Sequence, residues 1–175
     1  MDEELLSLPT RRRLYEAVRR NPGVGARQLQ RAAGTGWGET VYHLDRLTAA
    51  GLLDRERAVH QDHYYVRSVP GADRPLLSVC RSPSARRLLL ALLERPGATV
   101  PELGGATGLS PGRLSVHLRR LVATGVLSAG RRGRYRTFAV VDPDRVVRVL
   151  TSYRESFADA WVERLLETWA ELFRT

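Results

Sequence analysis

Four arginines gather in one short stretch of the chain, GRRGRYR, at residues 130–136. They are Arg131, Arg132, Arg134 and Arg136, and the glycines of the segment GRRG indicate a turn among them. Guanidinium groups this close repel one another unless an anion lies between them, and their planar donors fit phosphate oxygens. The spacing therefore predicts a polyanion-binding hairpin whose tip carries the charge.

A second candidate site lies just upstream, in SPGRLSVHLRRL at residues 110–121. On a helical wheel, Leu114, Leu118 and Leu121 form one apolar stripe. The remaining faces carry mostly small and basic side chains, namely Ser110, Gly112, Arg113, Ser115, Val116, Arg119 and Arg120. Small residues permit close approach, Arg can bind guanine edges or phosphates, and Val can touch a thymine methyl group. These features favour a reader of the DNA major groove over a merely solvated helix face.

The excess positive charge lies in the same part of the chain. The 175 residues carry 28 basic and 19 acidic side chains, for a net charge of +9, and every basic one is Arg. Residues 1–70 hold 11 Arg and 9 acids, residues 71–141 hold 12 Arg and 3 acids, and residues 142–175 hold 5 Arg and 7 acids. A GC-rich genome explains Arg in place of Lys, but it does not explain this concentration, which favours a polyanionic partner.

The elements that would position these residues come in two copies. A shift of 74 residues aligns Pro9–Val66 with Pro83–Val140 without a gap, with 20 identities in 58 positions. Each copy predicts three short helices followed by two strands. In the second copy, Thr99 and Glu102 have the spacing of a capping box, and Ser110-Pro111 opens the third helix. The order predicts a mainly α, α+β winged helix in each copy.

The domain organisation follows from the repeat. Residues 1–68 are the first winged helix, residues 69–82 are a linker with Pro, Gly and Asp, and residues 83–141 are the second winged helix. Residues 142–175 predict a long amphipathic helix, kinked near Ser152. Its apolar stripe consists of Leu150, Tyr153, Phe157, Trp161, Leu165, Trp169 and Leu172. Because a long helix outruns the surface of a domain of about 60 residues, pairing with a second chain is favoured over packing on its own domains.

The first copy has the opposite charge at two positions of the helix that corresponds to residues 110–121. Asp45 stands where the second copy has Arg119, and Glu39 stands where it has Arg113. Carboxylates oppose phosphates, so the first copy is expected to bind DNA weakly or to contact protein or the dimer partner. The alternative is phosphate contact through its other polar side chains, Arg11, Arg12, Arg13, Arg27, Arg31, Tyr42, Arg46, Arg55 and Arg57.

Other functions find little support. Cys80 is the single cysteine, and the pair His60 and His63 is a weak metal signal, so neither a metal nor a cofactor is expected. No nucleophile, base and orienting acid form a catalytic pattern, so an enzyme is not expected. The sequence has no run of 18 apolar residues and no secretion signal. We therefore expect a cytoplasmic location and no membrane association.

Taken in order, LPTRRRLYEAVRRNPGV, YHLDRLTAAGLL, SPGRLSVHLRRL and YRESFADAWVERLLETW resemble archaeal tandem winged-helix transcriptional regulators, relatives of the MarR and ArsR groups. The resemblance implies two winged helices, a dimerising C-terminal helix and control of transcription through binding to double-stranded DNA. We therefore expect a homodimeric, sequence-specific regulator whose second winged helix makes most DNA contacts. The alternative is a tandem winged-helix protein-interaction or chromatin-architectural protein. No effector ligand is implied.

Overall fold

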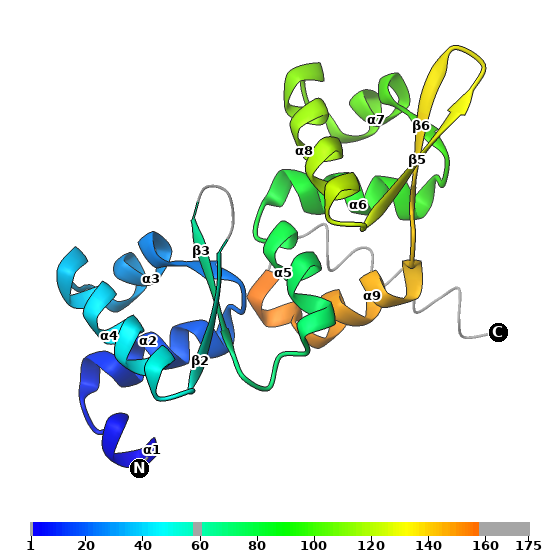
Figure 1. Cartoon of the computed structure of the whole chain (residues 1–175). Helices are drawn as coiled ribbons and strands as arrows, with labels where there is room; N and C mark the ends of the chain where they lie inside the picture. The colour runs from blue at the N-terminus through cyan, green and yellow to red at the C-terminus, as the bar shows by residue number, and fades with distance from the viewer. Residues whose placement is uncertain (1, 58–60, 158–175) are drawn as a thin grey trace. The chain divides into compact units, whose positions relative to one another are not determined.

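The two copies of the sequence repeat form two units in a computed structural model, which describes residues 2–57 and 61–157 (Figure 1). Unit 1 is Met1–Ser78 and unit 2 is Val79–Thr175. In both units, three helices pack against a small three-stranded antiparallel sheet. None of the helices in the described part of the chain is long and apolar enough to cross a membrane.

Unit 1 is built around the apolar stripes of three helices. Its elements are α1 (Asp2–Leu5), α2 (Pro9–Arg20), β1 (Val24–Gly25), α3 (Ala26–Ala33), α4 (Trp37–Ala49), β2 (Leu53–Arg57) and β3 (Asp62–Val66), followed by the 3-10 helix η1 (Gly71–Asp73). Helix α5 (Arg74–Cys80) follows, and the boundary between the two units falls within it. Leu14 of α2, Leu29 of α3 and Leu44 and Leu47 of α4 are fully buried. The sheet order is β1-β3-β2, and Leu53 pairs with Val66 where the hairpin begins.

Unit 2 repeats this order and adds a C-terminal extension. Its elements are α6 (Pro83–Glu94), β4 (Ala98–Thr99), α7 (Val100–Thr107), α8 (Pro111–Ala123), β5 (Leu127–Arg132), β6 (Tyr135–Val140), α9 (Pro143–Ser152) and the 3-10 helix η2 (Arg154–Phe157). The sheet order is β4-β6-β5, and Leu127 pairs with Val140. Leu88, Leu103, Leu118 and Leu121 are buried in its core.

The backbones of the two copies keep one frame. Helices α2, α3 and α4 begin and end 74 residues before α6, α7 and α8. The glycines that end α3 and α7, Gly34 and Gly108, both have φ +65°, a left-handed conformation that favours glycine at a helix end. The predicted capping box is also present, with Thr99 and Glu102 at the start of α7. The prediction of two tandem, mainly α winged helices is confirmed.

The strands and the linker differ in detail from the sequence prediction. Each sheet has a third strand, β1 or β4, of only two residues, which the sequence did not predict. The segment predicted as the linker, residues 69–82, contains helix α5, whose Leu76, Leu77 and Cys80 are buried. Burial of this apolar run explains why the segment is helical despite its Pro and Gly residues.

The tip of the second hairpin lies later than predicted. The sequence placed the turn at GRRG, residues 130–133, whereas β5 continues through Arg132, which pairs with Tyr135. The turn is therefore Gly133-Arg134, and Gly133 has φ +61°. A glycine at the first position of a two-residue hairpin loop matches the twist of the strands without strain. Arg131 and Arg132 are consequently strand residues whose side chains have fixed partners across the ladder.

The C-terminal segment departs from the predicted single long helix. Helix α9 ends at Ser152, where the kink was predicted, and η2 follows. Leu150 and Phe157, predicted as dimer contacts, are buried within the chain itself, 0% and 1% exposed. The guanidinium of Arg81 lies 4.1 Å from the centre of the Phe157 ring. For these two residues the structure supports packing on their own domain.

Of the other predicted dimer contacts, only Tyr153 lies in the part of the chain that the structure describes. Tyr153 is half-buried at the end of α9. The remaining four, Trp161, Leu165, Trp169 and Leu172, lie outside the described residues.

Candidate nucleic-acid interface

Helix α8 presents the predicted face to solvent. It begins at Pro111 after Ser110, which occupies the capping position although its side chain makes no capping hydrogen bond. Burial of the Leu114, Leu118 and Leu121 stripe turns the other side of the helix outward. All of the predicted contact residues of this segment are exposed, namely Ser110, Gly112, Arg113, Ser115, Val116, Arg119 and Arg120. Val116 is 60% exposed, which leaves an apolar group free for contact with a base.

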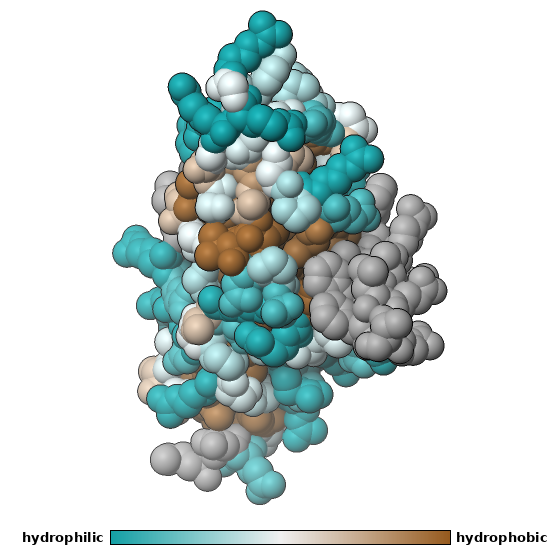
Figure 2. Space-filling view, turned by 90° about the vertical axis from the view of Figure 1, so that its right-hand side faces the viewer, coloured by the Kyte–Doolittle hydropathy of each residue, from teal (hydrophilic) through white to brown (hydrophobic). Residues whose placement is uncertain are grey.

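The hairpin β5–β6, called here the wing of unit 2, brings arginines together across its strands. Arg131 and Arg136 are direct cross-strand partners. Residues opposite each other share one face of a sheet, and like charges in that arrangement are destabilising. Figure 2 shows hydrophilic side chains covering the tip of the wing. An anion between Arg131 and Arg136 would relieve this repulsion.

Arg132 has an intramolecular partner. Its guanidinium donates hydrogen bonds to both carboxylate oxygens of Glu102, at 2.8 and 3.1 Å. The carboxylate of Glu102 also accepts bonds from the backbone N–H (2.6 Å) and the hydroxyl (2.8 Å) of Thr99. The bonds from Thr99 and then Arg132 lower the pKa of Glu102 to about 2. Arg132, predicted to contact DNA, thus ties the wing to the start of α7.

Glu102 is the functional residue whose second role the sequence prediction missed. The sequence marked it only as half of a capping box. It is, however, the only acidic residue between Glu94 and Asp142, in a segment with eight arginines. That isolation was the available signal that it has a basic partner. Arg134, the remaining tip residue, donates to the hydroxyl of Tyr135 at 2.7 Å and stays exposed.

The equivalent surface of unit 1 has a different charge. Residues 111–141 carry seven Arg and no acid, whereas residues 37–67 carry four Arg and five acids. Asp45, at the position of Arg119, accepts a 2.8 Å bond from Arg55 on β2. Asp62 on β3 lies 3.9 Å from the same guanidinium. Arg55 was a predicted phosphate contact, and the structure instead places it between two carboxylates of its own domain.

The other acids of β2 are also paired. Arg74, at the start of α5, binds Asp54 at 2.6 Å and Glu56 at 3.0 Å. Its guanidinium also lies 5.1 Å from the centre of the Tyr65 ring, and the side chain is only 13% exposed. The two acids of this strand are therefore neutralised by an arginine from another element of unit 1.

The remaining predicted contacts of unit 1 fall into two groups. Arg11 donates to Nδ1 of His43 at 3.3 Å, and Arg27 stacks on Trp37 at 3.9 Å from the ring centre. Burial and then the charge of Arg11 lower the pKa of His43, which keeps this imidazole neutral at pH 7. The second group is exposed and consists of Arg12, Arg13, Arg31, Tyr42, Arg46 and Arg57.

Comparison with known families assigns both domains. Residues 9–77 match a family described as an N-terminal HTH domain, and residues 81–128 match the family described as winged helix-turn-helix DNA-binding. The chain is a tandem winged helix-turn-helix protein. Each match begins at or within two residues of the start of one copy of the sequence repeat, and the second contains α8, the exposed basic helix, but ends at residue 128, before most of the wing. No curated protein matches the full sequence of this tandem helix-turn-helix protein.

Solved structures similar to the tandem helix-turn-helix protein include two bacterial proteins and a transcriptional regulator of the ArsR family. NolR from Sinorhizobium fredii is 26% identical and covers 51% of this chain and 87% of its own, with a TM-score of 0.43. Reduced HlyU from Vibrio cholerae is 20% identical and covers 47% and 86%, with a TM-score of 0.42. A transcriptional regulator of the ArsR family is 25% identical and covers 62% and 98%, with a TM-score of 0.36.

Proposed function

We propose that the tandem helix-turn-helix protein is a homodimeric, sequence-specific DNA-binding regulator of transcription, in which unit 2 makes most of the DNA contacts. The observation that carries this proposal is the difference between two equivalent surfaces. The outward face of α8 and the wing expose arginines without a single acid in residues 111–141. In unit 1, Asp45 holds the nearest wing arginine, Arg55, in an internal ion pair.

The geometry of unit 2 suits the roles of a winged helix on DNA. Helix α8 enters the major groove, where Arg113 and Arg119 reach guanine edges or phosphates and Val116 reaches a thymine methyl group. Arg131 and Arg136 of the wing then contact phosphates or the minor groove. Arg132 sets the angle of the wing through Glu102.

The test compares charge reversals in the two units. Binding sites are first selected from a random duplex pool with the full chain, and affinities of variants are then measured on the enriched sequence. We expect Arg119→Glu to weaken binding by about 10- to 100-fold, since one well-placed base contact is worth roughly 1–3 kcal/mol. Arg46→Glu in α4 should weaken it by less than about threefold, because exposed charges away from the contact act only through screened fields.

Arg120→Glu is the matched control, because Arg46 and Arg120 occupy equivalent positions of α4 and α8 and both are exposed. A larger loss for Arg120→Glu than for Arg46→Glu supports the assignment of DNA binding to unit 2. Equal losses at the two positions contradict it and make the two winged helices equivalent readers.

A second function is favoured by the paired charges of unit 1. A surface whose charged side chains are paired within their own unit suits contact with protein, so a tandem winged-helix interaction or chromatin-architectural protein is the alternative. Purely architectural binding is almost wholly electrostatic. Enrichment of no sequence from the random pool, with equal affinity for all duplexes and a steep salt dependence, would favour that alternative.

A further inference from the structure

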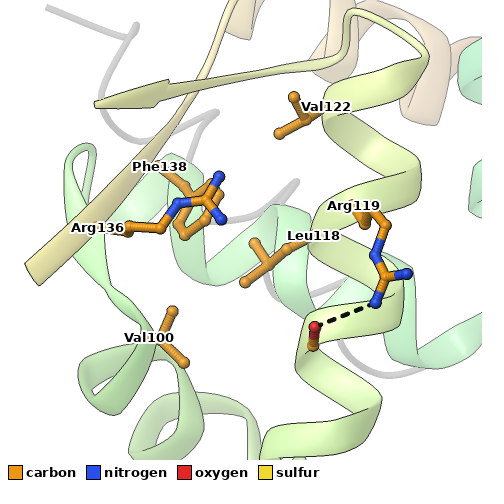
Figure 3. Close-up of a pocket in the computed structure, with 7 residues that line it drawn as sticks. Val100, Leu118, Arg119, Val122, Arg136 and Phe138 are labelled. Carbon is orange, nitrogen blue, oxygen red and sulfur yellow. Dashed lines mark hydrogen bonds between the residues drawn. The ribbon is translucent and has the colours of Figure 1, made fainter. Parts of the chain in front are cut away.

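A cavity of about 280 Å³ opens in unit 2 between α8, the start of α7 and strand β6 (Figure 3). Leu118 and Val122 project into it from α8, and Val100 projects from α7. The remaining lining residues are Phe138 and Arg136 of β6 and Ser115 and Arg119 of α8. The cavity thus lies between the proposed DNA-reading helix and the wing.

The floor of the cavity is apolar and its rim is basic. Leu118 and Phe138 are each 4% exposed, so they form the bottom. The guanidinium of Arg136 lies 5.4 Å from the centre of the Phe138 ring. Arg119 makes only a long contact of 3.5 Å to the hydroxyl of Ser115, drawn as the dashed line in Figure 3. Among the described residues, the seven that line the cavity include no carboxylate.

The repeat provides an internal comparison for this site. In unit 1, the guanidinium of Arg55 lies between the carboxylates of Asp45, at 2.8 Å, and Asp62, at 3.9 Å. Arg55 is on β2 and pairs across the sheet with Tyr64. A cation supplied by the chain therefore lies between two anions, one on α4 and one on β3.

Unit 2 has the opposite charge at the two outer positions and no charge at the central one. Addition of 74 residues takes the two carboxylates to Arg119 and Arg136, and takes the central arginine to Ala129, which pairs with Phe138. The two outer positions are therefore both cationic. The central position has lost its side chain beyond Cβ, so the chain supplies no charge of its own there.

We propose that this cavity binds a small organic anion with a compact apolar body, and that the bound anion excludes DNA from unit 2. The acid head binds Arg119 and Arg136, where planar donors suit a carboxylate, and the body covers Leu118, Val122 and Phe138. A DNA phosphate could use the arginines but would leave the apolar floor uncovered. Inorganic phosphate alone would leave it uncovered too.

The exclusion of DNA rests on the proposed function. Arg119 and Arg136 are also the proposed DNA contacts, so an anion that engages them removes donors from the phosphates and bases. The coupling is reciprocal, and DNA weakens binding of the anion by the same factor. Binding of the anion itself does not depend on DNA and is measured without it.

The test uses cyclohexanecarboxylate as the probe, titrated into the full chain by calorimetry. We expect one site per chain, and at least tenfold weaker binding of cyclohexylmethanol, which lacks the charge, and of inorganic phosphate, which lacks the body. Arg136→Gln should weaken binding of the probe at least tenfold. The proposal is overturned if the probe shows no binding at concentrations up to about 10 mM, because its affinity would then be weaker than that of ordinary millimolar ligands. Equal affinity in Arg136→Gln also overturns it.

A substitution at Ala129 separates a specific site from general damage. Ala129→Glu places a carboxylate between Arg119 and Arg136, the mirror of Arg55 in unit 1. This variant should bind the probe at least tenfold more weakly than the wild type. It should also unfold at a higher temperature, which a merely disruptive change would not do. Ala129→Gln, which has the same size without the charge, should show no rise in unfolding temperature. Undiminished probe binding by Ala129→Glu contradicts the proposal.

Fluorescence anisotropy with a selected DNA site then tests the coupling. A saturating concentration of the probe should weaken DNA binding at least tenfold, and an unchanged DNA affinity overturns the exclusion. A chain that binds the probe but no DNA under any condition retains the site and refutes the proposed function instead. The two failures are therefore distinguishable.

Discussion

At the scale of single residues, Glu102 has two structural roles. Its carboxylate caps the start of α7 through Thr99 and fixes the wing through Arg132. The capping role follows from the sequence, because Thr99 and Glu102 have the local spacing of a capping box. The ion pair joins residues 30 positions apart, and local periodicity carries no information about such a contact. Its partner could be inferred only from the absence of other acids nearby.

Glu102 makes the stability of unit 2 depend on pH in a specific way. Its pKa is about 2 in the folded chain against 4.5 for the free side chain, so its contribution is complete above about pH 4.5. The contribution is lost as pH falls through 4.5 toward 2, because the unfolded chain then binds the proton more readily. We expect the difference in free energy of unfolding between wild type and Glu102→Gln to shrink over that range. Urea titrations from pH 2 to 7 measure this, and a difference that is constant with pH contradicts it.

At the scale of elements, the repeat explains what could be predicted. Helices of 8 to 13 residues with leucine stripes and capping signals were located from sequence, since each carries several turns of the pattern. Strands β1 and β4 have two residues each, too short for alternation to appear. Helix α5 was missed because its Pro and Gly neighbours resemble a loop, whereas burial of Leu76 and Leu77 decides its conformation.

The same limit applies to the candidate site. Exposure of the basic face of α8 could be derived from the leucine stripe alone. The ion-pair partners of Arg55 and Arg132 could not be derived from the sequence, because these pairs depend on which face of the hairpin lies against which helix. The wing turn lies two residues later than predicted, so Arg131 and Arg132 are strand residues with cross-strand partners and not turn residues.

The element η2 provides a stability test. Phe157 is 1% exposed beneath the guanidinium of Arg81. We expect Phe157→Ala to destabilise unit 2 by about 3–5 kcal/mol, as for other buried aromatic residues. Tyr153→Ala, at a half-buried position, is the control and should cost less. Chemical unfolding followed by circular dichroism measures both. A loss below about 1 kcal/mol for Phe157→Ala, with a loss of dimer mass, would return Phe157 to a dimer interface.

At the scale of the whole molecule, the two units divide the charge between them. All of the charged side chains in residues 111–141 are positive at neutral pH. The equivalent residues of unit 1 include both acids and arginines, several of which form ion pairs within that unit. Under the proposed function, each chain reads one half-site through unit 2, and two chains are needed for a two-fold site. The proposed homodimer rests on the aromatic and leucine residues of positions 158–175 in the sequence.

Removal of residues 158–175 tests the homodimer. The cut leaves Phe157 in place, so unit 2 keeps its buried aromatic residue. We expect the full chain to have the mass of two protomers in light scattering and the truncated chain the mass of one. Affinity for a two-fold DNA site should fall at least tenfold on truncation, while affinity for a single half-site stays the same, because linked modules gain from effective concentration. A truncated chain that remains dimeric refutes the proposal.

The common backbone frame of the two units has a consequence for protein engineering. Because α4 and α8 occupy equivalent positions, the outward residues of one can be transplanted onto the other without a new loop or a change of register. A chimaera with Glu39→Arg, Asp45→Arg, Arg55→Ala and Asp62→Arg would give α4 the charges of α8 and would place the residues of unit 2 at the two neighbouring strand positions. A second basic helix face therefore requires substitutions on an existing scaffold and not a new domain.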